Sequence, residues 1–189
     1  MNLELFIHQF VDSSYTPGDA LPFSVEEISV PKHTILTDYG QVERKAYFLL
    51  KGIAKISMIR QDGEERVLEF FFPGQFFSAY SSFLTQKPSD VQVKVLTEAT
   101  MQVLSQEAMT AAYAHSLLAN KLGRLAAEFY YIRKTQREKD FLTKSASERY
   151  MDLLHGRPEL VQQIPIQLIA KYLGVTPESL SRIRKSISE

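Results

Sequence analysis

The sequence predicts an α+β protein in which a β-rich N-terminal half precedes a helical C-terminal half. Between residues 23 and 104, short apolar runs alternate with turn residues at a spacing of roughly 8–12 residues, which is typical of an antiparallel roll, barrel or sandwich. Beyond Ser105, the apolar residues recur at the spacing of helices instead. The change of period at Ser105 therefore separates two kinds of structure within one chain.

The composition is that of an ordinary globular protein, with 189 residues, 44% hydrophobic residues and no cysteine. Without cysteine, the chain has no disulfide, iron–sulfur cluster or thiolate metal site. No apolar run reaches the roughly 18 residues of a membrane span. The N-terminus lacks the basic flank of a signal peptide, and we therefore expect a cytoplasmic protein without a membrane partner.

The formal net charge is zero, but the charges are unevenly distributed along the chain. Residues 1–120 hold 9 Lys and Arg against 14 Asp and Glu, a balance of −5, whereas residues 121–189 hold 13 against 8, a balance of +5. Such an asymmetry indicates that the two halves have different partners, and the basic half is the candidate for binding a polyanion.

The β-rich half follows a short helix predicted over residues 3–11, where apolar side chains recur at helical spacing. Turn residues separate the runs that come next, and Asp62-Gly63 between two of them predicts a β-hairpin. The predicted strands are Glu27–Val30, Thr34–Thr37, Lys45–Leu50, Ala54–Arg60, Arg66–Phe72, Val91–Leu96 and Thr100–Leu104.

A single long helix is predicted over residues 106–138, where an apolar stripe has the spacing 4, 3, 4, 3. At the standard helical rise, such a helix is about 45 Å long, longer than a small β domain covers alone. Core packing is one interpretation of the stripe, but a heptad seam between two parallel chains fits the length better. The predicted dimer residues are Leu118, Leu122, Leu125, Phe129 and Ile132.

The charged run Arg133–Asp140 predicts a hinge to a second unit, and a solvated helix end is the alternative, which is compatible with it. Ser145-x-x-Glu148 is a capping box that opens the next helix. We therefore divide the chain into a β domain over residues 1–105, a dimerisation helix over 106–138 and a helical domain over 139–189.

Residues 166–185 have the pattern of a helix-turn-helix. At each key position, the residue type suits the steric requirement of the motif. Gly174 stands where the turn favours positive φ, Thr176 is a good N-cap, and Pro177 suits the first helical turn. Ala170 is small where the two helices approach each other. The predicted buried contacts are Ile169, Leu173, Leu180 and Ile183. A plain αα-hairpin within a helical bundle is the alternative.

A helix-turn-helix that reads DNA inserts the N-terminal side chains of its second helix into the major groove. Glu178, Ser179 and Arg182 are then expected to face base edges, since glutamate accepts from cytosine N4 and arginine forks onto guanine O6 and N7. Gln167, Thr176 and Lys185 are better placed for phosphates. The alternative for the basic residues is a solvated helix C-terminus that complements the helix dipole.

In this order, a β domain, a long helix and a helix-turn-helix resemble the Crp/Fnr family of transcription regulators. The resemblance is carried by Pro73-Gly74-Gln75-Phe76-Phe77 and by Ala170…Gly174…Glu178-Ser179…Ser181-Arg182. It implies a β-roll of the double-stranded β-helix or jelly-roll type and a winged-helix-like reader whose wing is truncated. It also implies a cytoplasmic, sequence-specific homodimer whose partners are double-stranded DNA, a second copy of the chain and RNA polymerase.

The resemblance places an effector pocket at the entry to the roll, lined by Phe77, Ser78, Ala79, Tyr80, Ser89 and Asp90. Family members that bind cyclic AMP use a glutamate for the ribose and an arginine for the phosphate, ten residues apart. Those positions fall on Ala79 and Ser89, which supply neither the carboxylate nor the cation. We therefore expect no cyclic-nucleotide binding, and a small apolar effector is a hypothesis.

Dense aromatic residues surround the same segment, and we interpret them as core rather than pocket. They are Phe70, Phe71, Phe72, Phe76, Phe77, Tyr80 and Phe83.

An enzyme is the competing class, because a β-roll can also hold a catalytic metal. The four histidines are scattered, no His-x-His pair exists, and only His33 lies within the β region, so neither a metal site nor a haem site is expected. No phosphate-binding loop or nucleophile elbow is present. The remaining alternative is a module that senses small molecules or binds protein without binding DNA. The basic residues Lys171, Arg182, Arg184 and Lys185 argue against it.

Overall fold

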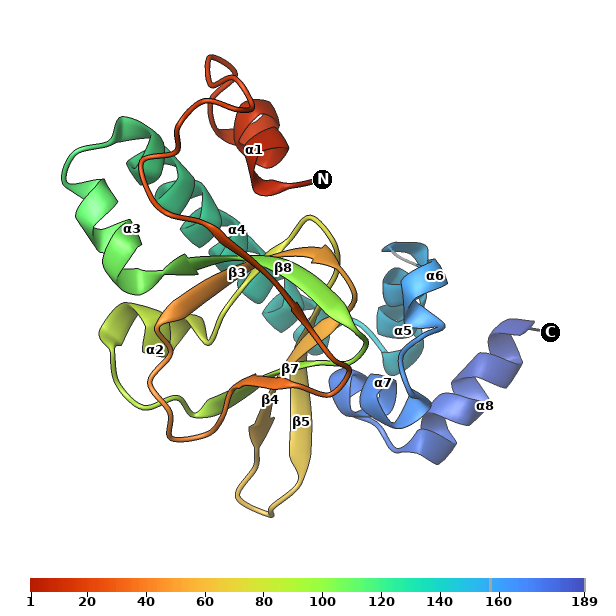
Figure 1. The fold of residues 1–189 in the computed structure, drawn as a ribbon. Helices are drawn as coiled ribbons and strands as arrows, with labels where there is room; N and C mark the ends of the chain where they lie inside the picture. The colour runs from red at the N-terminus through yellow and green to blue at the C-terminus, as the bar shows by residue number, and fades with distance from the viewer. Residues whose placement is uncertain (157, 189) are drawn as a thin grey trace. The chain divides into compact units, whose positions relative to one another are not determined.

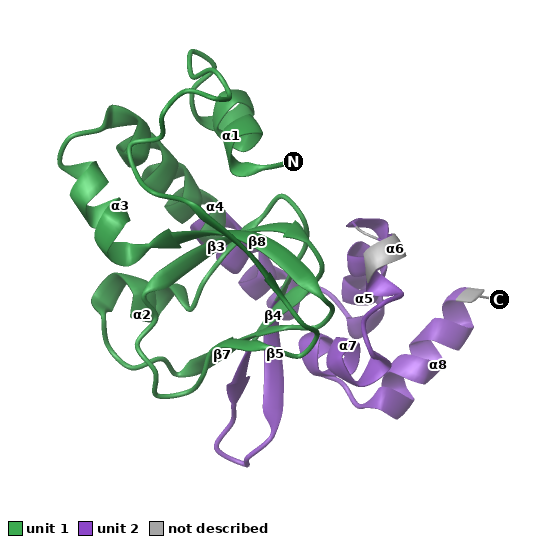
Figure 2. Ribbon diagram, in the orientation of Figure 1, with its two compact units in different colours: residues 1–56, 70–130 green, residues 57–69, 131–189 purple. Residues whose placement is uncertain are grey.

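The computed structural model describes residues 1–156 and 158–188. Arg157 and Glu189, which belong to the predicted segment 139–189, lie outside the described residues. The chain forms two compact units (Figure 2): residues 1–56 with 70–130, and residues 57–69 with 131–189. The second unit therefore combines the C-terminal helices with residues 57–69, a hairpin of the β region. The predicted boundaries at 105 and 138 placed this hairpin in the β domain instead.

Within the described residues, eight strands form two four-stranded sheets (Figure 1). The strand orders are β1-β8-β3-β6 and β2-β7-β4-β5, and β8 pairs antiparallel with β1 and β3. All seven predicted strands are present, and the added strand β6 has only two residues. The bounds are β1 Glu26–Val30, β2 Ile35–Thr37, β3 Lys45–Lys51, β4 Ala54–Ile59, β5 Glu65–Phe71, β6 Phe76–Phe77, β7 Val91–Val95 and β8 Ala99–Ser105.

The N-terminal segment closes the core of the first unit. Helix α1 (Leu3–Phe6) continues into a π-helical turn over Ile7–Val11. Leu3 and Ile7 have no exposed surface, and the Phe6 ring lies 5.3 Å from that of Phe48, centroid to centroid. Because Leu3 and Ile7 are apolar and fully buried, their burial stabilises the packing of the N-terminal segment on the roll.

The structure has two helices where the sequence predicted one over residues 106–138. Helix α3 (Gln106–Tyr113) ends before Ser116, and α4 (Leu117–Thr143) begins after it. The Ser116 hydroxyl accepts a hydrogen bond from the Ala119 amide at 3.2 Å, which is an N-cap contact. The charged run 133–140 does not break the helix, because it lies inside the C-terminal part of α4 as a helix end would, and the boundary between the two units falls just before it, between residues 130 and 131.

The predicted dimer stripe divides into two parts along α4. Leu122 is only 2% exposed, and it packs with Leu118 and Leu125 against the core of the first unit. Leu122 is therefore part of that core, whereas Leu118 and Leu125 are half-buried against it. In contrast, Phe129 is 45% and Ile132 is 60% exposed, so this end of the stripe has the most surface available to a second chain.

The second unit contains four helices besides the end of α4, among the residues that the structure describes. They are α5 (Ala146–Gly156), α6 (Pro158–Val161), α7 (Ile166–Leu173) and α8 (Pro177–Ser188). Ile169, Leu173 and Leu180 are buried as predicted, whereas Ile183 is only half-buried. Within the described ranges, no helix combines the length and apolar character of a membrane span.

Candidate nucleic-acid interface and ligand cassette

The helix-turn-helix has the local geometry that its sequence predicts. Gly174 adopts φ +75°, and a Cβ built on it would lie 3.3 Å from Cε1 of Phe141. Ala170 is 1% exposed, and its carbonyl accepts from the Val175 amide at 3.1 Å. Thr176 caps α8, because its Oγ1 accepts from the Ser179 amide at 3.2 Å. The turn residues therefore set the start of α8.

One face of α8 presents the side chains predicted to read bases. Glu178 and Arg182 are exposed and four residues apart, so they are neighbours on the helix surface. Arg182 Nη2 donates to Ser179 Oγ at 3.3 Å. Hydrogen bonds from its own amide and from Thr176 hold the pKa of Glu178 below its usual range. The face therefore offers an anionic acceptor beside a cationic fork, and this pair suits base edges.

The residues predicted to contact phosphates have different surroundings. Gln167, near the start of α7, and Lys185, near the end of α8, are both exposed. Thr176 is exposed too, but its hydroxyl already bonds to the amide and the hydroxyl of Ser179. The cap therefore competes with any phosphate for the Thr176 hydroxyl.

Several cations of the basic half are paired within the second unit. Lys171 Nζ lies 3.0 Å from Glu65 Oε2, and Arg133 Nη2 lies 3.1 Å from Glu69 Oε1. Glu65 and Glu69 belong to β5, far from these cations in the sequence. The net charge of +5 is thus partly neutralised, and Lys171 contributes less to a polyanion site than its sequence position indicates.

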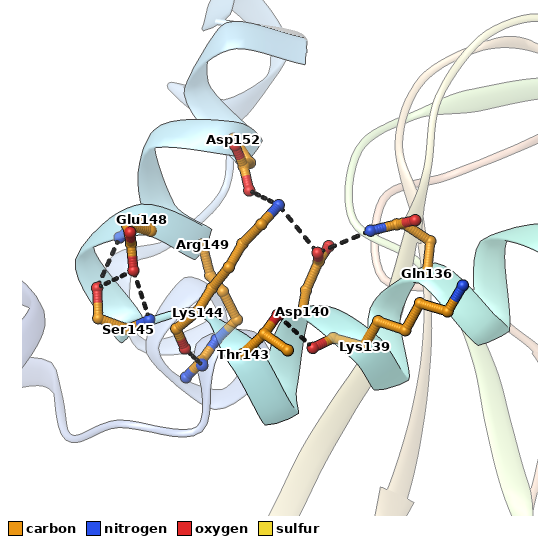
Figure 3. A network of polar contacts seen from close by, with 9 residues as sticks. All are labelled: Gln136, Lys139, Asp140, Thr143, Lys144, Ser145, Glu148, Arg149 and Asp152. Carbon is orange, nitrogen blue, oxygen red and sulfur yellow. Dashed lines mark hydrogen bonds and ion pairs between the residues drawn. The ribbon is translucent and has the colours of Figure 1, made fainter.

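The junction between α4 and α5 is held by a polar network (Figure 3). Lys144 Nζ lies 2.9 Å from Asp140 Oδ1 and 2.8 Å from Asp152 Oδ2. These hydrogen bonds, first that of Asp152, raise the pKa of Lys144. The predicted capping box is present, since Glu148 Oε2 accepts from the Ser145 amide at 2.7 Å. Ion pairs and hydrogen bonds therefore hold the turn between α4 and α5 in place.

The ligand cassette is filled by its own hydrogen bonds. It runs from β6 through α2 (Tyr80–Thr85) to β7. Ala79 is 1% exposed, and the 5%-exposed Ser89 donates from Oγ to the Val91 carbonyl at 2.7 Å. Ser78 Oγ donates to the Lys45 carbonyl at 2.9 Å. The groups that would face a nucleotide therefore bond to the protein backbone instead, and of the predicted cassette residues only Asp90 is exposed.

A buried carboxylate that sequence reasoning missed lies beside this segment. Glu43 is 2% exposed and accepts hydrogen bonds from the Thr37 hydroxyl and, at 2.9 Å, from the Lys45 amide. Its own amide donates to Ser82 Oγ of α2 at 3.0 Å. Burial, together with the charge of Glu43, raises the pKa of Tyr47. A glutamate between two strands gives no sequence signal that it folds inward.

Tyr80 joins the cassette helix to the long helix. Its ring centroid lies 4.9 Å from that of Tyr130 on α4 and 6.4 Å from that of Phe83. Burial raises the pKa of Tyr80. Of the seven aromatic residues predicted as core, Phe70, Phe71, Phe72, Phe77 and Phe83 are each at most 7% exposed, whereas Phe76 and Tyr80 are half-buried. Among the described residues, no three His, Asp or Glu side chains are grouped as metal ligands are.

Comparison with known proteins agrees with this architecture. Residues 27–116 match the family model of the cyclic nucleotide-binding domain. No curated protein matches the chain. Among solved structures, FixK2 from Bradyrhizobium japonicum is 17% identical with a TM-score of 0.74, and the match covers 87% of this chain and 85% of that one.

Two further structures are similar over comparable lengths. A CRP-family transcriptional regulator from Thermus thermophilus is 17% identical, with a TM-score of 0.69 and coverage of 85% and 84%. The global regulator CLP from Xanthomonas campestris, described as responsive to c-di-GMP, is 18% identical, with a TM-score of 0.68 and coverage of 87% and 86%. The chain therefore shares the fold of solved structures described as Crp/Fnr-family transcription regulators, and its residues 27–116 match the model of the cyclic nucleotide-binding domain.

Proposed function

We propose that the chain is a homodimeric transcription regulator of the cytoplasm, without enzymatic activity, that binds a palindromic DNA site through α8. Its partners are duplex DNA, a second copy of the chain and, at a promoter, RNA polymerase. The observation that carries the proposal is the exposed face of α8, where the exposed Glu178 and Arg182 lie beside the half-buried Ser179 on a helix whose other side buries Leu180.

The reading step follows from the chemistry of these side chains. Arg182 donates two parallel hydrogen bonds to guanine O6 and N7, and Glu178 accepts from cytosine N4. The lowered pKa of Glu178 keeps its carboxylate ionised, so it remains an acceptor. Lys185 and Gln167 contact phosphates and set the register without reading sequence.

Dimerisation through α4 explains the exposed apolar side chains of that helix. Phe129 and Ile132, three residues apart on one face of the helix, are 45% and 60% exposed, and exposed apolar side chains grouped in this way are typical of a protein interface. Two chains paired here present two recognition helices, and consecutive major grooves on one face of B-DNA are about 34 Å apart. The expected site is therefore two half-sites related by a twofold axis.

The state of the cassette supports a regulator that does not respond to cyclic AMP. A ribose and a cyclic phosphate need a carboxylate and a cation, and Ala79 and Ser89 provide neither. Ser89 Oγ donates to the Val91 carbonyl, and the Tyr80 ring packs at a tilt against that of Tyr130. Any effector of another kind must displace these contacts before it can bind.

Selection of bound sites from random duplex DNA tests the proposal. The purified chain is expected to enrich a palindrome with half-site centres about one helical turn apart. The same palindrome is expected with and without cyclic AMP. Failure to enrich any sequence, in either condition, would instead support the other class, a sensing or protein-interaction module that does not bind DNA.

A further inference from the structure

Arg137, on the C-terminal part of α4, connects three segments of the second unit. Its Nη2 donates to the Val67 carbonyl of β5 at 3.2 Å and to the Tyr172 carbonyl of α7 at 3.0 Å. Its Cζ lies 4.0 Å from the centroid of the Tyr172 ring and 4.8 Å from that of Phe141. A guanidinium satisfies two acceptors and two aromatic faces at once because it is planar and carries five donors.

Arg137 donates to backbone carbonyls that receive no hydrogen bond from the helix or sheet to which they belong. The Tyr172 carbonyl is in the last turn of α7, where no later helical amide can reach it. The Val67 carbonyl belongs to β5, which is the edge strand of its sheet. Each of these groups needs a donor from elsewhere, and hydrogen bonds from a cation are the stronger kind.

A second arginine continues the same arrangement at the turn. Arg149 of α5 donates from Nη2 to the Leu173 carbonyl at 2.9 Å and from Nη1 to the Lys144 carbonyl. Its Cζ lies 4.3 Å from the centroid of the Phe141 ring. The last two carbonyls of α7 before Gly174 are therefore both held by arginines that contact Phe141.

We propose that Arg137 is a positioning residue that fixes the helix-turn-helix on the end of α4. It contacts α7 rather than the exposed face of α8, and α7 and α8 are in contact, with Leu173 of α7 and Leu180 of α8 both fully buried. A tilt of α7 is therefore passed to the recognition helix. This inference rests on the proposed function, because in a dimer formed through α4 the attachment of α7 to α4 sets the separation of the two readers.

The test compares Arg137→Lys with wild type on DNA of varied half-site spacing. Lysine keeps the positive charge and loses the planar fork. The matched control is Arg124→Lys, on the same helix, whose side chain is 70% exposed and pairs only with Glu128 among the ion pairs of the described residues. Fluorescence anisotropy of the full chain is measured with the selected palindrome, with spacers one or two base pairs longer and shorter, and with non-specific duplex.

Wild type and Arg124→Lys are expected to prefer one spacing. For Arg137→Lys, the ratio of affinities between the preferred spacing and the other spacings is expected to fall about tenfold. A loss of this size corresponds to one cation–π contact with a charge-assisted hydrogen bond. Its affinity for non-specific duplex should stay at the wild-type value. An unchanged spacing profile would overturn the proposal. An equal loss on every duplex would overturn it too, because Arg137 would then be a phosphate contact.

The wild-type titration alone tests the proposed function. If the wild-type chain binds no duplex DNA, the proposed function is overturned, and the role of Arg137 is overturned with it. If Arg137→Lys does not fold, Tyr172→Leu replaces it. That variant removes an aromatic face against the guanidinium and keeps the backbone acceptor, and the same results are expected to support or overturn the proposal.

Discussion

Lys171 Nζ lies 3.0 Å from Glu65 Oε2, so a cation on the first helix of the helix-turn-helix is paired within the protein. The two side chains are 41% and 21% exposed. A pair this accessible to water contributes at most about 1 kcal/mol to stability. The larger effect of the pair is electrostatic, because Glu65 neutralises the charge of Lys171 and so lowers the positive potential at the surface that a polyanion would bind.

Glu65→Gln is expected to release Lys171 for DNA. Non-specific affinity should rise at low salt, and the slope of log K against log salt should steepen by about 0.9, the value for one added phosphate contact. Glu64→Gln, an exposed neighbour on the same hairpin, is the control and should match wild type. The slopes come from anisotropy titrations at several salt concentrations, and an unchanged slope for Glu65→Gln would show that Lys171 stays away from DNA.

Ile132→Glu is expected to prevent the proposed dimerisation without unfolding the chain. Ile132 is 60% exposed, so a charge costs little in the isolated protomer but would be buried in the proposed seam. Sedimentation equilibrium should give a dimer for wild type and a monomer for the variant at micromolar concentration. Leu84→Glu, which changes another 60%-exposed apolar side chain, this one on α2, should remain dimeric. A dimeric Ile132→Glu would place the interface elsewhere.

Restoring the two ligand-binding residue types is expected to destabilise the roll rather than create a cyclic AMP site. Ala79 and Ser89 are 1% and 5% exposed, so A79E/S89R forces two charged side chains into filled volume. We expect a loss of several kcal/mol, in the range for overpacking combined with buried charge. Thermal unfolding with and without cyclic AMP measures both effects. A higher melting temperature with cyclic AMP would contradict the closed cassette.

The contact between Asp12 and Lys121 predicts a pH dependence of stability. Their side chains are 2.6 Å apart, and the hydrogen bond from Lys121 lowers the pKa of Asp12 to about 2. A folded-state pKa below the unfolded one adds stability above the unfolded value of 3.8, and this contribution is lost as the pH falls toward 2. Asp12→Asn should therefore be less stable than wild type at neutral pH.

Denaturant unfolding at several pH values measures this difference between wild type and Asp12→Asn. The gap in unfolding free energy should narrow between about pH 4 and pH 2. Asp90→Asn, which changes an exposed carboxylate in the cassette, is the control. A gap that stays constant over this range would mean that the Asp12 carboxylate is not the titrating group.

Local patterns were sufficient to predict the strands and the helix-turn-helix. Each predicted strand has apolar residues between turn residues, and Gly174 and Thr176 act as their residue types indicate. The break between α3 and α4 has no glycine or proline to mark it, and Ser116 is a cap only because the chain turns there. Periodicity also shows which face of α4 is apolar but not what covers it, so Leu122 could not be assigned to the core in advance.

The exposed face of α8 follows from helical spacing alone, whereas its surroundings do not. Lys171 and Glu65 are 106 positions apart in sequence, so their pairing depends on the tertiary fold. The same holds for Arg137, whose acceptors lie on β5 and α7. Glu43 folds inward because buried donors satisfy it, and its surroundings include Ser82 of a segment distant in sequence.

The most direct test of the account is the affinity of wild type, Arg182→Ala and Lys185→Ala for the selected site and for a scrambled duplex. Arg182→Ala is expected to lose about 1–3 kcal/mol of discrimination between the two sequences, because a base contact is removed. Lys185→Ala should weaken both duplexes equally and lower the salt slope by about 0.9. If Arg182→Ala keeps the wild-type ratio of affinities, α8 does not read the site as proposed.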